Sequence, residues 1–229
     1  MYLDYYGLHR EPFHITPDPY FFYLSPSHKE AFASMIYGLK NRKGFMAITG
    51  EVGLGKTTVL RTFLEQWAKK KKVKTVFIFN TDISFKGLLK IILEELEVEH
   101  PFLPEQEGNQ QWEISYKEEV FELVQLLHKT LIQEYQDEQN VILVIDEAQN
   151  MPLETLESLR MLSNLETAKD KLLQIFLIGQ PELEEKLKRS ELRQLRQRIA
   201  IRAALKPLSK HEAYEYIKSR LKKSGALAS

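Results

Sequence analysis

The 229-residue sequence predicts an α/β domain built on a mainly parallel, doubly wound sheet. Short apolar runs, each suited to a buried strand, alternate with segments whose apolar residues recur at helical spacing. This alternation is typical of a parallel sheet with helices on both faces. Two of the strands are followed directly by residues that carry chemistry, a glycine-rich loop in one case and a pair of acids in the other.

The chain opens with an aromatic, proline-rich segment over residues 1–27, here called the strap. Its prolines argue against a long helix, so we expect an extended segment that packs on the domain through its rings. The alternative is that the rings line a base pocket near the glycine-rich loop. A helix over residues 27–40 follows, with Ser27 as its expected N-cap and Glu30 in the capping-box position.

Apolar runs and periodicity place the remaining elements. Strands are expected over residues 45–49, 75–80, 141–145, 172–180 and 199–203. Helices are expected over residues 57–70, 85–96, 116–135 and 151–165, from Pro181 onward, and from the cap Ser209 to residue 221. A polar loop is expected over residues 99–114. The lysine run at 69–72 reads as a solvated helix end, or else as a nucleic-acid contact.

The glycine-rich loop fits the phosphate-binding pattern G-x-x-x-x-G-K-[ST]. The matching stretch is Gly50-Glu51-Val52-Gly53-Leu54-Gly55-Lys56-Thr57-Thr58. Its glycines allow backbone N–H groups to turn inward around a phosphate, and Lys56 can reach the outer phosphates. The Thr57 hydroxyl can bind Mg²⁺. A strand before the loop and a helix after it place the positive end of the helix against the phosphates.

Five consecutive aliphatics at 141–145 precede Asp146 and Glu147, which indicates a strand buried on both faces with two acids at its carboxyl end. Ligands of open α/β sheets bind at this edge. Asp146 is expected to hold Mg²⁺, and Glu147 to orient and activate an attacking water.

Composition excludes several classes of chemistry. The chain has no cysteine, so disulfides and thiol ligands are excluded. The 32 basic and 32 acidic residues balance, and this gives no overall signal for nucleic acid. No signal peptide and no membrane-spanning run are apparent, so a cytoplasmic chain is expected, or the cytosolic part of an inner-membrane protein. The six histidines are scattered rather than grouped as metal ligands.

Motifs along nearly the whole chain are similar to those of the AAA+ superfamily and, within it, of ExeA/GspA-type secretion ATPases. They are Met1-Tyr2-Leu3-Asp4-Tyr5-Tyr6-Gly7-Leu8, Pro12-Phe13, Thr16-Pro17-Asp18-Pro19, Leu24-Ser25-Pro26-Ser27-His28, Tyr37-Gly38-Leu39, the phosphate-binding loop, Asp146-Glu147-Ala148-Gln149, Gly179-Gln180-Pro181-Glu182-Leu183, Gln197-Arg198-Ile199 and Leu205-Lys206-Pro207-Leu208-Ser209.

This resemblance implies the AAA+ core, with a parallel five-stranded sheet in the order 5-1-4-3-2, and ATP/ADP with Mg²⁺ as ligands. Gln180 matches the sensor 1 position. Arg198 matches the arginine finger offered to a neighbouring subunit, with Arg193 and Arg196 as alternatives. Residues 1–43 are expected to form the strap and first helix, 44–207 the ATPase core, and 208–229 the start of a truncated helical lid. We therefore expect the chain to be the front part of a longer protein.

The function expected from the resemblance is Mg²⁺-dependent ATP hydrolysis by a self-associating ATPase that powers or regulates assembly of a bacterial secretion or pilus-type envelope machine. An envelope secretion protein would be its partner. Two alternatives stay open. One is an AAA+ ATPase of DNA transactions, a transposition regulator or loader, which the neutral charge disfavours. The other is a nucleotide-dependent scaffold with little turnover.

Overall fold

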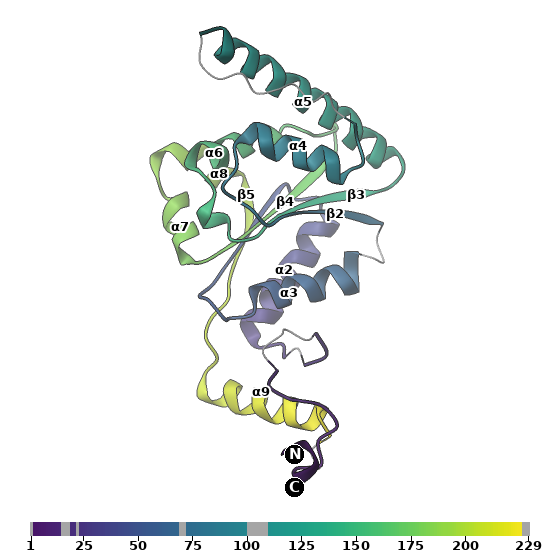
Figure 1. Ribbon diagram of the computed structural model, residues 1–229, viewed down its shortest axis with the longest axis vertical. Helices are drawn as coiled ribbons and strands as arrows, with labels where there is room; N and C mark the ends of the chain where they lie inside the picture. The colour runs from purple at the N-terminus through teal and green to yellow at the C-terminus, as the bar shows by residue number, and fades with distance from the viewer. Residues whose placement is uncertain (1, 15–18, 22, 69–71, 100–109, 226–229) are drawn as a thin grey trace.

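The computed structural model describes residues 2–14, 19–21, 23–68, 72–99 and 110–225, and its centre is one parallel sheet (Figure 1). The sheet has five strands in the order β2-β3-β4-β1-β5, which confirms the expected order. The strands are β1 (Phe45–Thr49), β2 (Val73–Ile78), β3 (Asn140–Ile145), β4 (Leu173–Gly179) and β5 (Ile199–Ala204). Because every neighbouring pair is parallel, all carboxyl ends meet at one edge.

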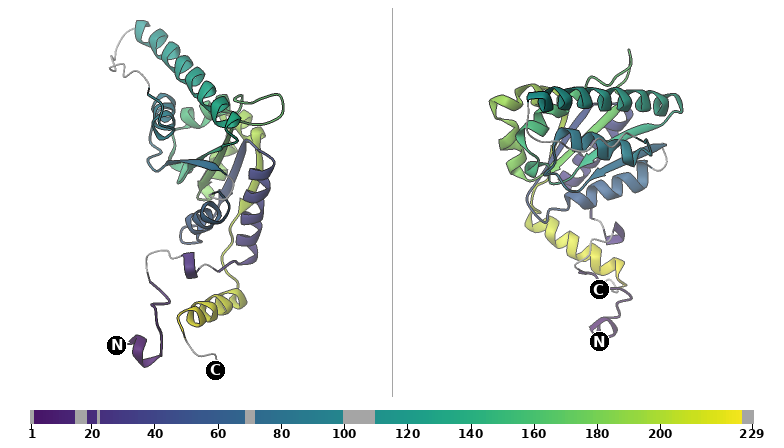
Figure 2. Two further views of the ribbon diagram at one scale, coloured as in Figure 1. Left: turned by 90° about the vertical axis from the view of Figure 1, so that its right-hand side faces the viewer. Right: turned by 45° about the horizontal axis from the view of Figure 1, so that its top comes forward.

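Helices cover both faces of the sheet (Figures 1 and 2). One face carries α2 (Pro26–Lys40) and α3 (Lys56–Phe63), which continues as one turn of π-helix, η2 (Leu64–Ala68). The other face carries α4 (Phe85–Glu95), α5 (Gln110–Gln136), α6 (Leu153–Leu162) and α8 (Arg193–Arg198), with α7 (Pro181–Leu187) at its side. Single 3₁₀ turns are η4 (Ala148–Asn150) and η5 (Ser190–Leu192).

Strands β1, β3 and β4 are buried along their whole length. Their alternate residues enter two separate apolar clusters, one beneath each layer of helices. This explains why these strands read in the sequence as continuous apolar runs, without a polar face.

The strap and the last helix, α9 (Lys210–Lys223), lie together beyond α2 and α3, away from the sheet (Figure 2). Within the strap, α1 (Tyr2–Tyr5) and the 3₁₀ turn η1 (Pro19–Phe21) are short, as its prolines predict. The strap and α9 are joined by a bond from Arg220 to the carbonyl of Pro12 (2.6 Å) and by one from His9 N–H to the carbonyl of Ser224 (2.7 Å). The segment that begins the described chain thus contacts the segment that ends it.

The strap's rings pack less than expected. Five are about half exposed or more: Tyr2, Tyr5, Tyr6, Phe13 and Tyr20. Phe21 is buried at 3% exposure, and Tyr23 is partly buried. The expectation of packing through the rings is therefore wrong for most of the described strap, because the strap lies against exposed α9 rather than against the sheet. Phe22 and residues 15–18 lie outside the described residues.

The cap of α2 differs from the prediction. Ser25, not Ser27, caps the helix: its hydroxyl accepts from the N–H of His28, and Pro26 occupies the first turn. Proline suits that position, and it holds the preceding residue in extended backbone, as a cap requires. The predicted helix start at Pro181 is confirmed, and so is the predicted cap Ser209, which forms its capping box with Glu212.

Several boundaries also shift. The expected loop over 99–114 is wrong at its end, because α5 begins at Gln110, directly after the last glycine and asparagine of that stretch. Residues 100–109 and 69–71 lie outside the described residues. The second strand runs from Val73 to Ile78 rather than over 75–80, because its register follows β3 from Asn140 onward. The helix expected over 151–165 is shorter, since Pro152 precedes its first turn.

Among the described helices, none combines the length and apolar character needed to cross a bilayer.

Candidate functional site

The glycine-rich loop connects β1 to α3 at the carboxyl edge of the sheet. Gly53 and Gly55 adopt positive φ angles of 79° and 82°, which glycine accepts without strain. Gly55 is the N-cap of α3 and has no side chain to bond the first helical N–H groups. Those groups and the positive end of the helix therefore point into the loop, the arrangement that binds anions elsewhere. Glu51 and Val52 are exposed at its tip.

Lys56 begins α3 and turns back into the loop. Its ammonium is buried and donates to the carbonyls of Gly50 (2.8 Å) and Glu51 (3.1 Å). The loop thus holds a cation at its centre, a position where a phosphate oxygen can replace the carbonyls as acceptor.

Thr57 and Asp146 meet across the sheet edge, although 89 residues separate them in sequence. The Thr57 hydroxyl donates to Oδ2 of Asp146 (3.3 Å), while Oδ1 accepts from the N–H of Glu147 (2.9 Å). A hydroxyl and a carboxylate are hard oxygen ligands that fit Mg²⁺, which usually takes one or two carboxylates and completes its shell with water and substrate phosphates. The described part of the chain contains no cluster of three or more His, Asp or Glu residues that could hold a metal alone.

Glu147 follows β3 in left-handed backbone, with φ at 50°. Its Oε2 accepts from the side-chain amides of Gln180 (3.0 Å) and Gln149. These bonds, that of Gln180 first, lower the pKa of Glu147 below its usual value, and the charge of Lys56 acts in the same direction. The carboxylate therefore stays ionised, as a group that orients water must be.

The structure thus brings together the loop, Lys56, Thr57 and the acid pair, with Gln180 at the end of the neighbouring strand β4. Residues from three strand ends contribute because β1, β3 and β4 are adjacent in the sheet. Thr58 lies one residue further along α3 and lines the cavity described below.

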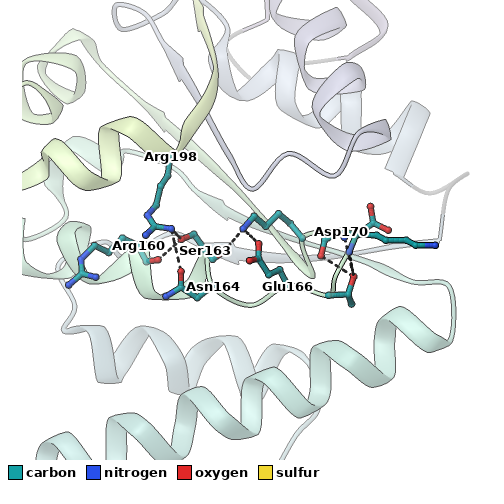
Figure 3. Close-up of polar contacts among 9 residues, drawn as sticks. Arg160, Ser163, Asn164, Glu166, Asp170 and Arg198 are labelled. Carbon is teal, nitrogen blue, oxygen red and sulfur yellow. Dashed lines mark hydrogen bonds and ion pairs between the residues drawn. The ribbon is translucent and has the colours of Figure 1, made fainter.

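Arg198 lies elsewhere. It immediately precedes β5, whose first residue, Ile199, pairs with Phe45 at the start of β1, so Arg198 lies at the opposite edge of the sheet from the loop. Figure 3 shows its guanidinium against the end of α6, where it donates to Ser163 and to Asn164 (3.3 Å). The two alternatives, Arg193 and Arg196, lie on the same short helix, α8. Arg198 is therefore not placed to act on the nucleotide site of its own chain.

A cavity of about 500 Å³ adjoins the glycine-rich loop. Gly53, Leu54, Gly55 and Thr58 form its wall on the loop side. The strap and α9 supply most of the remaining lining, including Phe13, Phe21, Tyr23, Tyr216 and Arg220. Aromatic walls beside a phosphate-binding loop suit a flat heterocyclic base.

The sequence assigned no role to two contributors, although both lie in stretches similar to those of ExeA/GspA-type ATPases. Gln149 bonds to the site glutamate, and His28 bonds through Nε2 to the carbonyl of Leu54 in the loop (2.9 Å). The spacing of two residues after Glu147 is a weak signal for Gln149. His28 ends the stretch Leu24-Ser25-Pro26-Ser27-His28, but nothing in that stretch indicates a contact with the loop.

Fold and site together define the class: a P-loop nucleotide-binding α/β domain. A scan against protein families matches the AAA domain over residues 39–187, and the chain therefore belongs to the AAA domain family.

Within that family, the chain is 37% identical over 228 residues to general secretion pathway protein A of Aeromonas hydrophila. The alignment covers 99% of this chain and 39% of that protein, so the chain spans well under half of its relative. The resemblance to ExeA/GspA-type ATPases is thereby confirmed.

Solved structures agree on the fold. The chain is similar to Cdc6p of Pyrobaculum aerophilum, with a TM-score of 0.58 and 19% identity over 90% of this chain and 54% of that one. It is also similar to the ORC2 protein of Aeropyrum pernix in its ADPNP–ADP complexes, with a TM-score of 0.59 and 16% identity over 91% and 56% of the two chains. At these identities the likeness shows the fold alone.

Proposed function

We propose that this chain binds ATP with Mg²⁺ at the carboxyl edge of its sheet and hydrolyses the bond to the γ-phosphate. The contact between Thr57 and Asp146 is the observation that carries the proposal, because it joins the loop helix to the acid pair at one point. Bound there by these two residues, Mg²⁺ would neutralise charge on the phosphates.

The chain's own residues would act as follows. Loop N–H groups and Lys56 hold the phosphates, and Lys56 exchanges its carbonyl partners for phosphate oxygens. Glu147 accepts a hydrogen bond from the attacking water and orients it in line with the γ-phosphate, and Gln180 lies beside it to contact the water or the γ-phosphate. The base enters the aromatic cavity between the strap and α9.

We further propose that the chain self-associates and serves a machine of the bacterial cell envelope from the cytoplasmic side. The likeness to general secretion pathway protein A supports the role. The place of Arg198 supports self-association, since an arginine on the far edge of the sheet is available to a neighbouring copy but not to its own site.

Three variants test the hydrolysis. Lys56→Ala removes the cation inside the loop, and we expect loss of both ATP binding and phosphate release. Glu147→Gln keeps the shape of the side chain but not the anion, so binding should persist while turnover falls at least about a hundredfold. Lys72→Ala, on an exposed lysine paired with exposed Glu138, is the matched control and should behave as the parent.

Fluorescent-nucleotide titration and a phosphate-release assay, each with and without Mg²⁺, separate binding from chemistry. Equal phosphate release by the parent and Glu147→Gln would refute the role of Glu147. Binding by the parent without any release would instead favour the nucleotide-dependent scaffold.

A further inference from the structure

Gln149 lies on η4, the single turn that follows β3 and the acid pair. The turn is anchored in the core, because its first residue, Ala148, and the residue that follows it, Met151, are both completely buried. The position of Gln149 is therefore set by the fold rather than by its own side chain.

Both ends of the Gln149 side-chain amide are used. Its Nε2 donates to Oε2 of Glu147, and its Oε1 accepts from the backbone N–H of Gln180 (3.1 Å). The Gln180 side chain closes the triangle by donating to the same oxygen of Glu147 (3.0 Å). A backbone N–H can only donate, which fixes which end of the Gln149 amide faces Gln180 and leaves its N–H₂ for the carboxylate.

Neighbouring elements are shaped around this amide. Gly179, the last residue of β4, has no side chain, and a Cβ there would come within 2.7 Å of Oε1 of Gln149. From α7, the Lys186 ammonium donates to the carbonyls of Gln149 (2.9 Å) and Met151, so the turn is held from its outer side as well. Three elements thus combine to keep one amide against one carboxylate.

The geometry points to Gln149 as a positioning residue for ATP hydrolysis. We propose that it holds Oε2 of Glu147 so that the other oxygen, Oε1, is presented to the attacking water, and that it links this carboxylate to the sensor residue Gln180. The inference rests on the proposed function. The bonds from Gln149 and Gln180 both fall on Oε2, so these two amides leave Oε1 for the water.

A misplaced carboxylate slows the chemical step without weakening the binding of ATP, because Glu147 acts on the attacking water rather than on the bound nucleotide. A general loss of structure would lower turnover and affinity together. The split between turnover and affinity is therefore the readout that a purely structural role would not produce.

The test uses Gln149→Ala and Gln149→Met, the second of which keeps most of the side-chain length without its hydrogen bonds. We expect turnover to fall about tenfold or more in both, while the dissociation constant for ATP stays within about twofold. Asn150→Ala, which removes an exposed amide from the same turn, is the control and should match the parent.

Parental turnover in Gln149→Met, faster turnover than the parent, or equal losses of turnover and ATP affinity would overturn the role of Gln149 and leave the proposed function standing. Parental phosphate release no greater than that of Glu147→Gln would overturn both, so the two failures are distinguishable. Melting curves show whether each variant is folded. If Gln149→Ala does not fold, Gln149→Met alone tests the role of Gln149.

Discussion

At the scale of single residues, the site places a non-glycine residue, Glu147, in left-handed backbone. Such a conformation costs of order 1 kcal/mol and persists where the surroundings hold it, which here means the buried strand before it and the two glutamine amides. Backbone strain at Glu147 fits a residue whose carboxylate is positioned for catalysis rather than for the stability of the fold.

The lowered pKa of Glu147 predicts a pH dependence of stability. A carboxyl whose folded pKa lies below its unfolded value stabilises the fold above the unfolded pKa, about 4.3, and loses this contribution as pH falls through the lower, folded pKa. We expect Glu147→Gln to reduce the free energy of unfolding by about 1 kcal/mol or less at neutral pH, because a neutral acceptor replaces a charged one.

Urea unfolding of the parent and Glu147→Gln across this range checks the prediction. The difference between the two proteins should shrink toward low pH. A difference that stays constant with pH would show that the carboxylate's hydrogen bonds do not depend on its ionisation.

The sequence predicted Lys56, Thr57, Asp146 and Glu147 as one site because each lies at a fixed distance from a strand end, and strand order brings the ends together. Gln149 and His28 could not be predicted in this way. Their contributions depend on which atom a side chain meets in space, and no spacing rule encodes the contact of His28 with Leu54, 26 residues away.

At the scale of elements, strands and their order were predictable, whereas helix ends were less so. The continuous apolar runs of β1 and β3 indicate strands buried on both faces. The start of α2, by contrast, depended on which of the two serines that flank Pro26 caps the helix, and it is the one before the proline. The start of α5 fell inside a stretch read as polar loop, since polar helix formers such as Gln110 and Gln111 give no apolar period.

Helix α2 contacts the phosphate-binding loop through its first turn, and this contact yields another prediction. His28 is buried, its Nε2 lies 2.9 Å from the carbonyl of Leu54, and its Nδ1 lies 2.5 Å from the hydroxyl of Ser25. Burial lowers the pKa of His28, opposed in part by the bond to Leu54 and the charge of Glu212, so the ring is neutral at pH 7. Nε2–H then donates to Leu54, and Nδ1 accepts from Ser25.

We expect His28→Ala to lower the free energy of unfolding by about 1–3 kcal/mol and to weaken ATP binding, because the loop carbonyl loses its donor. The stability of the parent should also fall as pH drops below about 6.5, since the unfolded chain then binds a proton that the folded chain resists. Chemical unfolding at several pH values and nucleotide titration measure both effects. His211→Ala, on exposed α9, is the control, and equal losses in the two variants would contradict the specific contact.

At the scale of the whole molecule, the two edges of the sheet carry different groups. The carboxyl edge holds the phosphate loop and the acids, and the opposite edge holds Arg198 against the end of α6 (Figure 3). Arg198 of one copy therefore does not reach the proposed γ-phosphate position of its own site. A neighbouring copy that turned its Arg198 edge toward this site would supply an arginine there, once the guanidinium leaves Ser163 and Asn164.

This arrangement predicts that turnover depends on two copies. Specific activity should rise with protein concentration, and Arg198→Ala should lower turnover at least about tenfold without changing ATP affinity, because an arginine finger acts on transition-state charge. Arg193→Ala and Arg196→Ala are the matched comparisons on the same helix. The decisive measurement mixes Arg198→Ala, which binds ATP, with Lys56→Ala, which keeps its arginine. If the mixture releases phosphate although neither variant does so alone, Arg198 acts in the site of the neighbouring copy. If the mixture shows no recovery and the rate of the parent does not depend on protein concentration, Arg198 serves only the contacts that it makes within its own chain.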